Sequence, residues 1–342
     1  MGFASASAGQ IASFTENPLA LSVVSTAGTD YAIPFFGGFN NPVPQLVDID
    51  GDGDLDLFIQ ETSNDLQYYE NTGSAQSPAF VLRSRRWNDL SIGAWFRFVD
   101  VDSDGDYDVL GNQTFNAIRY YENIGSPQTT DFILRADTLR SSDGTVVTTE
   151  LPNIPAIVDI DCDENLDLLL GLNDGTITHF EQSGFDSGLP VFNFVEQNYQ
   201  DILVVGESGK SDRHGANALI VDDLDADGIS DLLWGDFFEL SLITFINASD
   251  TCADVELVRT ADTLTTLNEG PFLTRGFNVP AVGDLDGDGF NDIVAGVLSN
   301  STVDDENTLY RFSSDAGNGW LLDTRRLIDG IDVGTASVPA IA

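Results

Sequence analysis

The chain has 342 residues, with 56 acidic and 14 basic side chains and a formal net charge of −42. This charge excludes partners that need a positive protein surface, so we expect neither nucleic acid nor an anionic membrane surface as a partner. A hydrophobic content of 42% is too high for a disordered acidic chain. Because no run of about 18 apolar residues occurs, we also expect no membrane insertion.

The acidic residues are mostly aspartates, 43 against 13 glutamates. Asp favours turns and caps, whereas Glu is compatible with helices, so the excess charge is expected in loops. Residues 1–12 are rich in Ala, Ser and Gly and lack the basic and apolar regions of a signal peptide. We expect them to form an N-terminal tail.

Five copies of one pattern follow along the chain: an apolar strand, then Asp-x-Asp-x-Asp-Gly-x-x-Asp with small variations, then a second apolar strand. The nine-residue Asp loops are residues 48–56, 100–108, 159–167, 223–231 and 284–292. Their first aspartates are 52, 59, 64 and 61 residues apart. Such even spacing identifies an internal repeat.

A second element follows the Asp loops. It reads LQYYENTGS at 66–74 and IRYYENIGS at 118–126, and it weakens at 177–184, 243–249 and 309–317. Each repeat therefore contains four short strands separated by Gly, Asn, Asp, Ser and Pro, with no apolar period of a helix. Four strands in a unit of this size are typical of a propeller blade, so we predict an all-β fold, a β-propeller of four-stranded blades.

The ends of the chain match parts of this repeat. Residues 13–43 are expected to form a partial blade, because 13–24 resemble the third and fourth strands. The tail 337–342 resembles 153–158 and 278–283, which precede two Asp loops, so it is expected to start a further repeat. The propeller domain would then span 13–342, with about six blades' worth of sequence and a longer chain completing the ring.

The Asp loops have the chemistry of a calcium site. Carboxylates at positions 1, 3, 5 and 9 and the backbone carbonyl of position 7 suit a hard cation with 6–8 oxygen ligands, and Ca²⁺ is favoured over Mg²⁺. Position 6 is Gly in four loops, because the chain turns sharply there with φ > 0. The expected ligands are Asp48, Asp50, Asp52, Asp54 and Asp56; Asp100, Asp102, Asp104, Asp106 and Asp108; Asp159, Asp161, Asp163, Asn165 and Asp167; Asp223, Asp225, Asp227, Ile229 and Asp231; and Asp284, Asp286, Asp288, Phe290 and Asp292.

Two other interpretations of the loops are weaker. An EF-hand needs flanking helices and Glu at position 12, where these loops have Ile59, Gly111, Leu170, Trp234 and Ala295. Solvated turns without an ion would leave four carboxylates repelling one another within nine residues. The third loop differs from the others, because Glu164 replaces the glycine of position 6. We expect its site to be weaker, distorted or empty.

At these residues the chain resembles the FG-GAP (VCBS-type) repeats that also build integrin α-subunit heads, and its YYENTGS and YYENIGS turns look most like secreted bacterial members. The resemblance covers about residues 13–342. It implies a β-propeller, most often of seven blades, with Ca²⁺ loops between the first and second strands of each blade. It also implies an extracellular protein that mediates adhesion, carbohydrate binding or assembly, with no shared catalytic residues.

Other candidate sites have simpler explanations. His179 occupies the aromatic position of Tyr68 and Tyr120 and is expected to pack there. His214 lies in a polar loop, and GESGKS at 206–211 lacks the first glycine and the following helix of a phosphate loop. Arg83, Arg85 and Arg86 form the one concentrated positive patch, either a site for an acidic sugar or strand residues paired with carboxylates. The tryptophans are expected to pack between blades.

Cys162 and Cys252 are 90 residues apart with no framework spacing, so we expect calcium rather than a disulfide to stabilise the fold. The sequence therefore predicts a secreted, calcium-stabilised, non-catalytic module of the cell exterior that binds a protein or carbohydrate or assembles with other surface proteins. Two alternatives stay open: the propeller domain of a polysaccharide-active enzyme such as a lyase, and a structural subunit of a surface layer or filament. The polar segments 201–217 and 299–307 are the expected binding surface.

Overall fold

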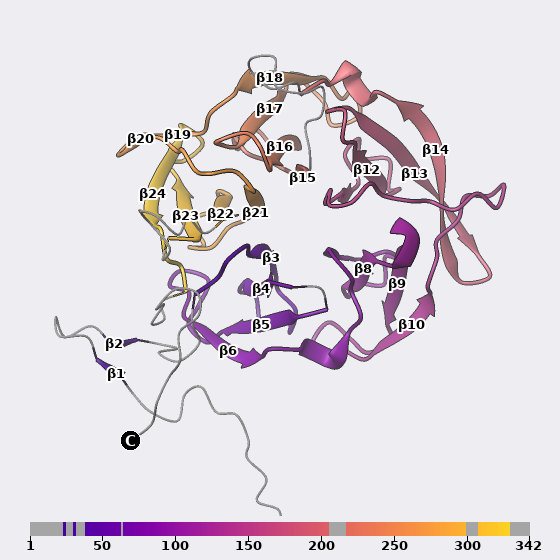
Figure 1. Ribbon diagram of the computed structural model, residues 1–342, viewed down its shortest axis with the longest axis horizontal. Helices are drawn as coiled ribbons and strands as arrows, with labels where there is room; N and C mark the ends of the chain where they lie inside the picture. The colour runs from indigo at the N-terminus through magenta and orange to yellow at the C-terminus, as the bar shows by residue number, and fades with distance from the viewer. Residues whose placement is uncertain are drawn as a thin grey trace, which may run out of the picture.

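The computed structural model describes residues 23–24, 30–31, 38–62, 64–204, 217–298 and 307–328. Within these ranges the regular elements are β-strands and three short 3-10 helices, η1 (Trp87–Asp89), η2 (Thr114–Asn116) and η3 (Tyr199–Asp201). Five antiparallel sheets stand around one axis as the blades of a β-propeller (Figure 1). None of the helices in the described part of the chain has the length and apolar character needed to cross a membrane.

Each blade is a meander of consecutive strands, and the first strand lies nearest the axis (Figure 1). Blade 1 comprises β3 (Val43–Val47), β4 (Asp56–Gln60), β5 (Leu66–Asn71) and β6 (Phe80–Ser84); blade 2, β7 (Phe96–Val99), β8 (Asp108–Asn112), β9 (Ile118–Asn123) and β10 (Phe132–Ala136); blade 3, β11 (Ala156–Val158), β12 (Asp167–Gly171), β13 (Ile177–Asp186) and β14 (Leu189–Gln197); blade 4, β15 (Asn217–Asp222), β16 (Asp231–Asp236), β17 (Ile243–Asn247) and β18 (Leu257–Ala261); and blade 5, β21 (Val279–Gly283), β22 (Asp292–Gly296), β23 (Leu309–Ser314) and β24 (Trp320–Thr324). Short strands β19 (Thr265–Thr266) and β20 (Gly270–Pro271) extend the outer edge of blade 5.

The second strand of each blade explains the apolar runs of the sequence. Every residue of β4, β8, β12, β16 and β22 is buried. A strand with neighbouring blades on both faces has no solvated side, so its residues do not alternate between apolar and polar. The predicted packing role of the tryptophans is confirmed for three of them, since Trp95 and Trp234 are fully buried and Trp87 is 9% exposed.

The ring closes with five blades. On the inside, β21 of blade 5 lies against β3 of blade 1, where a Cβ at Gly283 would meet the side chains of Leu46 and Leu55. This differs from the expected six blades' worth of sequence and seven-bladed ring, because blade 5 packs directly on blade 1 and leaves no room for another sheet. Of the predicted partial blade 13–43, the regular elements described outside β3 are β1 (Val23–Val24) and β2 (Asp30–Tyr31), which form a two-stranded sheet. The predicted further repeat at 337–342 lies outside the described residues.

The antiparallel order gives the propeller two different faces. Loops between the first and second strands and between the third and fourth strands of a blade lie at one end, which carries the Asp loops. Loops between the second and third strands, and the connections to the next blade, lie at the other end. We call these ends the Asp-loop face and the opposite face.

Candidate metal centres

The first aspartate of each Asp loop organises the loop backbone. Asp48 accepts hydrogen bonds from the backbone N–H groups of Asp52 and Gly53, both at 3.1 Å. The same position accepts from the N–H of position 6 in the other four loops, at 2.9–3.0 Å. The aspartate of position 5 in turn accepts from the N–H of position 7 in all five. These bonds fold nine residues around a common centre and leave carboxylate oxygens facing one another.

The predicted left-handed turn at position 6 is confirmed. Gly53, Gly105, Gly228 and Gly289 have φ between 87° and 94°, and Glu164 adopts φ 72° at the same position of the third loop. Position 4 also has positive φ in every loop, where the sequence supplies Gly51, Ser103, Cys162, Ala226 and Gly287. We did not predict this second turn, because only two of its five residues are glycines. The third loop keeps the shape of the others, at the strain cost of a non-glycine left-handed residue.

The last aspartate of each loop ties the loop to the blade. Asp56, Asp108, Asp167, Asp231 and Asp292 are each 1–2% exposed. In blades 1, 2, 4 and 5 this carboxylate accepts a hydrogen bond from a third-strand backbone N–H, at 2.7–3.1 Å. In blades 2 to 5 it also accepts from the N–H of loop position 2, at 2.9–3.2 Å. Position 9 is therefore a structural anchor as well as a candidate ligand.

Several carboxylate oxygens of the loops are buried and have no hydrogen-bond partner within the described residues. They are Oδ1 of Asp161, Asp225 and Asp286 at position 3, and Oδ1 of Asp54 and Asp106 at position 7. An unpaired buried acceptor costs roughly 1–3 kcal/mol. The donor set, several carboxylates with backbone oxygens and without sulfur, is that of a hard cation such as Ca²⁺. The residues present therefore fit such an ion.

The spacing of the oxygens agrees with this fit. In four loops, three carboxylates each offer an oxygen within 4.8 Å of the other two. These triplets are Asp48, Asp50 and Asp52; Asp100, Asp102 and Asp104; Asp159, Asp161 and Asp167; and Asp223, Asp225 and Asp231. A single cation can contact three oxygens that lie this close together.

Burial and mutual repulsion shift the protonation of these carboxyl groups. Burial, opposed in part by the backbone N–H of the third strand, raises the pKa of Asp56, Asp108 and Asp231 to about 7. At position 3 of every loop, burial first and neighbouring aspartates second raise the pKa of the carboxyl group. Without a cation, the folded loops therefore disfavour their own ionised form.

One third-strand residue reaches the position-9 carboxylate, and it differs between blades. In blades 1 and 2 the hydroxyl groups of Tyr68 and Tyr120 donate to this carboxylate at 3.1 Å. In blade 3, His179 Nε2 lies 2.5 Å from Asp167 Oδ1, so the residue predicted to pack there also hydrogen-bonds the loop. Blade 4 has Thr244 at the equivalent position, where it pairs with Leu233 as His179 pairs with Leu169.

Blade 5 has Arg311 at this position, and its guanidinium contacts two expected calcium ligands. Arg311 Nη2 donates to Asp292 Oδ2 at 3.0 Å and to Asp286 Oδ2 at 3.3 Å. The nearby positive charge opposes the burial of Asp292, whose pKa rises only to about 6. Arg311 was not among the predicted site residues, although the repeat places it in register with Tyr68 and Tyr120. Loop 5 is thus the one predicted site where a fixed cation already pairs with candidate ligands.

Each Asp loop also contacts the following blade, in four cases at the turn between its third and fourth strands and in blade 3 at the third strand β13. The contacts are Gly51 with Pro127, Val101 with Gln182, Cys162 with Cys252, Asp225 with Gly317, and Gly287 with Gln76. The last pair joins blade 5 to blade 1 and closes the ring on this face. Ordering one loop therefore also supports the neighbouring blade.

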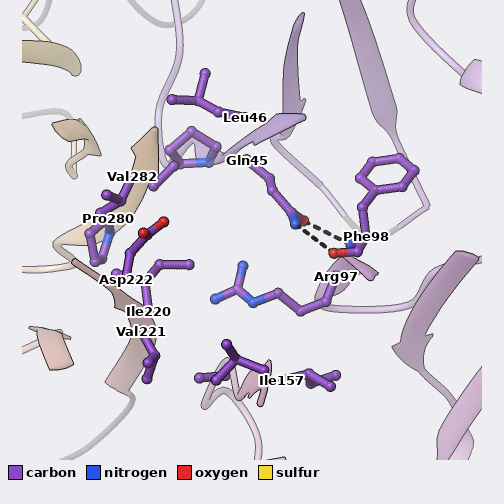
Figure 2. A pocket seen from close by; sticks show the side chains of 14 residues that line it. Gln45, Leu46, Arg97, Phe98, Ile157, Ile220, Val221, Asp222, Pro280 and Val282 are labelled. Carbon is purple, nitrogen blue, oxygen red and sulfur yellow. Dashed lines mark hydrogen bonds between the residues drawn. The ribbon is translucent and has the colours of Figure 1, made fainter. Parts of the chain in front are cut away.

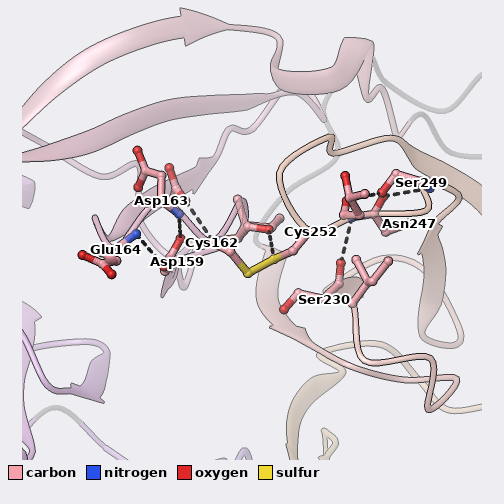
Figure 3. The surroundings of a disulfide bond; sticks show 12 residues. Asp159, Cys162, Asp163, Glu164, Ser230, Asn247, Ser249 and Cys252 are labelled. Carbon is pink, nitrogen blue, oxygen red and sulfur yellow. Dashed lines mark hydrogen bonds between the residues drawn. A yellow bond between two sulfur atoms is a disulfide. The ribbon is translucent and has the colours of Figure 1, made fainter.

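The contact between blades 3 and 4 is a disulfide, which corrects the expectation that no disulfide staples the fold (Figure 3). Cys162 and Cys252 have Cα atoms 5.7 Å apart. Their separation of 90 residues concealed the pairing. Position 4 of an Asp loop touches the next blade's turn, so a cysteine at each of these two places was a usable signal. The side chain of Cys162 points away from the loop's carboxylates, as predicted (Figure 3).

Among the described residues, the basic patch of the sequence analysis adds no second site. Arg83 pairs with Glu70 and Arg86 lies 3.8 Å from Asp89, so these two arginines of the basic patch are paired with carboxylates as the simpler explanation predicted. His214, the segment 206–211 and the larger part of 201–217 and 299–307 lie outside the described residues.

Comparison with known proteins agrees with the fold. Residues 48–111, which span the first two Asp loops, match the FG-GAP-like repeat family model. No match was found among curated protein sequences. With five blades that each carry an Asp loop, the chain is a β-propeller repeat protein. In residues 48–111 its repeats are similar to FG-GAP-like repeats.

Solved structures with similar propellers are distant. A lectin of Agrocybe aegerita, studied for recognition of non-reducing terminal N-acetylglucosamine, has a TM-score of 0.36 and 15% identity over 82% of this chain, and the match covers 65% of the lectin chain. AofleA of Arthrobotrys oligospora has a TM-score of 0.45 and 9% identity over 84% of this chain and 73% of its own. The fucose-specific lectin of Aleuria aurantia has a TM-score of 0.43 and 11% identity over 82% and 76%. TM-scores and sequence identities this low support no inference about a ligand.

Proposed function

We propose that the protein is a secreted β-propeller, stabilised by up to five Ca²⁺ ions, that works as a non-catalytic binding module. The observation that carries the proposal is the division of the molecule into two faces. One face gathers loops of clustered carboxylates, some of whose buried oxygens have no hydrogen-bond partner among the described residues, and the other presents exposed apolar side chains. A catalytic role would require reactive groups in a cleft, whereas the loop carboxylates are fixed by backbone hydrogen bonds.

The Asp-loop face supplies stability in this proposal. Bound Ca²⁺ neutralises the clustered carboxylates and is coordinated by the oxygens that have no hydrogen-bond partner. It also fixes each loop against the next blade. At a free calcium concentration 100-fold above the dissociation constant, each site adds about 2.7 kcal/mol to the free energy of unfolding. Millimolar external calcium fills sites with dissociation constants of about 10⁻⁴ M.

The exterior location rests on two features of the chain. A disulfide between Cys162 and Cys252 forms and persists in an oxidising compartment, whereas cytosolic thiols are kept reduced. Low-affinity calcium loops also function where calcium is abundant. Both features favour secretion or display at the cell surface.

The opposite face supplies binding. Four exposed side chains from blades 4 and 5, which we call the apolar loop cluster, are Phe238, Leu240, Leu273 and Leu298, with exposures of 65%, 51%, 61% and 44%. Their loops are joined by backbone hydrogen bonds from Thr274 to Leu240 and from Leu298 to Gly276. An apolar cluster held on ordered loops marks an interaction site on a soluble protein. Leucines do not stack on sugars, so the apolar loop cluster favours a protein ligand. Phe115 lies elsewhere on this face and is 92% exposed, and its aromatic ring suits a carbohydrate.

Thermal unfolding with and without a chelator tests the calcium part. We expect removal of Ca²⁺ to lower the Tm by more than 10 °C and re-addition to restore it, with Mg²⁺ far less effective. A melting curve unchanged by EDTA would contradict the proposal. Calcium counted by native mass spectrometry gives the number of ions.

Ligand capture tests the binding part. The immobilised calcium-loaded protein is exposed to a glycan array and, separately, to proteins of the culture medium. The double variant Phe238→Ser/Leu273→Ser should lose the captured ligand. Leu134→Ser, which changes a 48% exposed leucine on the outer strand β10, should retain it. Retention of the same ligand by the double variant would exclude the apolar loop cluster as the binding site.

A further inference from the structure

A pocket of about 150 Å³ lies on the axis of the propeller. Residues from the first strands of all five blades line it, so its walls come from the most buried and regular part of the ring. Figure 2 shows that polar side chains reach it from three blades: Gln45 of β3, Arg97 of β7 and Asp222 of β15. Most of the other lining side chains are aliphatic, among them Ile157, Ile220 and Val282.

Arg97 is a buried charge that forms no ion pair with any residue that the structure describes. It is 3% exposed, and its guanidinium points into the pocket (Figure 2). Nε donates to the backbone oxygen of Pro155 at 2.8 Å and Nη2 to that of Leu219 at 3.0 Å, while Nη1 has no hydrogen-bond partner within the described residues. Burial alone lowers the pKa of Arg97 to about 10, with no carboxylate opposing it. A buried cation in this state is strongly stabilised by an anion.

The other two polar groups of the pocket leave room for a ligand. The side-chain amide of Gln45 already donates one hydrogen bond to the backbone of Phe98 and accepts another from it, both at 3.1 Å. Asp222 accepts through Oδ1 from Asn291 Nδ2 at 2.8 Å and from the N–H of Asp223 at 2.9 Å. Its carboxylate faces the pocket and makes no ion pair with Arg97 (Figure 2). Arg97 and Asp222 thus present opposite charges to one small space.

We propose that this axial pocket binds a small carboxylate that also carries a hydroxyl or ammonium group. The ligand's carboxylate accepts a charge-assisted hydrogen bond from the guanidinium of Arg97, and its donor group binds the carboxylate of Asp222. The aliphatic walls hold the short carbon chain between them. A cavity of about 150 Å³ accommodates a molecule as large as benzene, so the ligand has about six non-hydrogen atoms.

Isothermal titration of the calcium-loaded full chain tests this site with four probes: lactate, alanine, propionate and 1,2-propanediol. Lactate and alanine should bind most tightly, propionate about tenfold more weakly because it lacks the donor, and propanediol not at all because it lacks the carboxylate. Asp222→Asn should weaken alanine binding by tenfold or more and leave propionate binding unchanged.

Two variants keep the test decisive. Arg97→Gln should abolish binding of all three carboxylates. Because Arg97 also joins blade 2 to blades 3 and 4, the Tm of the Arg97→Gln variant is measured in parallel. Ile157→Trp serves as a second variant, which fills the pocket while retaining Arg97. Loss of binding in Ile157→Trp with an unchanged Tm supports the site. Failure of every carboxylate to bind the wild type, undiminished binding by either variant, or full displacement by equimolar chloride would overturn the proposal.

Discussion

The Asp loops of blades 2 and 5, DVDSDGDYD and DLDGDGFND, share the aspartates of positions 1, 3, 5 and 9 and the glycine of position 6, yet their surroundings differ in charge. In blade 2 the neutral hydroxyl of Tyr120 meets the last aspartate, whereas in blade 5 the guanidinium of Arg311 bonds both Asp286 and Asp292. A motif therefore defines the ligands of a site but not its electrostatics. The third strand, contributed from further along the chain, sets how much negative charge remains for a metal ion.

Removing one candidate ligand from loop 2 or from loop 5 should give the largest difference in the free energy of unfolding. In calcium, Asp102→Ala should lower the free energy of unfolding by about 2–3 kcal/mol, the stabilisation lost with one well-filled site. Asp286→Ala should cost about half as much, because Arg311 already neutralises part of loop 5. Denaturant melts measure both, with Asp250→Ala, an exposed carboxylate outside the loops, as the matched control.

The same two variants should differ in sign when calcium is removed. Asp102→Ala then removes a buried carboxylate and relieves repulsion in the loop, so it should be neutral or stabilising, because burial first and neighbouring carboxylates second raise the pKa of Asp102. Asp286→Ala deprives Arg311 of one partner and should be mildly destabilising. Equal effects of both variants in both conditions would remove the distinction between the blades.

Exchanging Arg311 and Tyr120, the third-strand residues that contact the two loops, should reverse the difference in calcium affinity between loop 5 and loop 2. Arg311→Tyr should raise the calcium affinity of loop 5 by about tenfold, since one nearby positive charge at an effective dielectric constant of 20 is worth a few kcal/mol before screening. Tyr120→Arg should lower the affinity of loop 2 by a similar factor. Calcium titration followed by native mass spectrometry counts the sites filled at each concentration. Unchanged affinity in both variants would show that Arg311 moves aside when calcium binds.

The sequence predicted the repeating features well and the unique ones poorly. The four-stranded blades and the loop positions follow from patterns present in five copies, the left-handed glycines from a pattern present in four, and the structure has each of them. Arg97, Arg311 and the disulfide each occur once, and their partners are distant in sequence: Arg97 bonds Leu219, 122 residues away. Such contacts depend on the curvature of the ring, which no single repeat specifies. The number of blades was overestimated for the same reason, because ring closure is a property of blade packing.

The smallest expected effect is the pH dependence of the calcium-free protein. The pKa of Asp108 is raised by burial to about 7 and that of Asp292 to about 6, against 3.8 for an ordinary aspartate. Between about pH 4 and pH 7 the folded state therefore binds more protons than the unfolded state, so stability falls as pH rises. We expect the Tm of the chelator-treated, desalted protein to drop by several degrees from pH 5 to pH 8.

The comparison between blades sharpens this expectation. Arg311→Tyr removes the cation that holds down the pKa of Asp292, so the fall in stability between pH 5 and pH 8 should become steeper in that variant. Saturating calcium should abolish the fall in both proteins, because the ion displaces the protons and stabilises the ionised carboxylates. A Tm that rises from pH 5 to pH 8 without calcium would mean that the position-9 carboxylates are stabilised in their charged form, and that the loops fold stably around buried negative charge on their own.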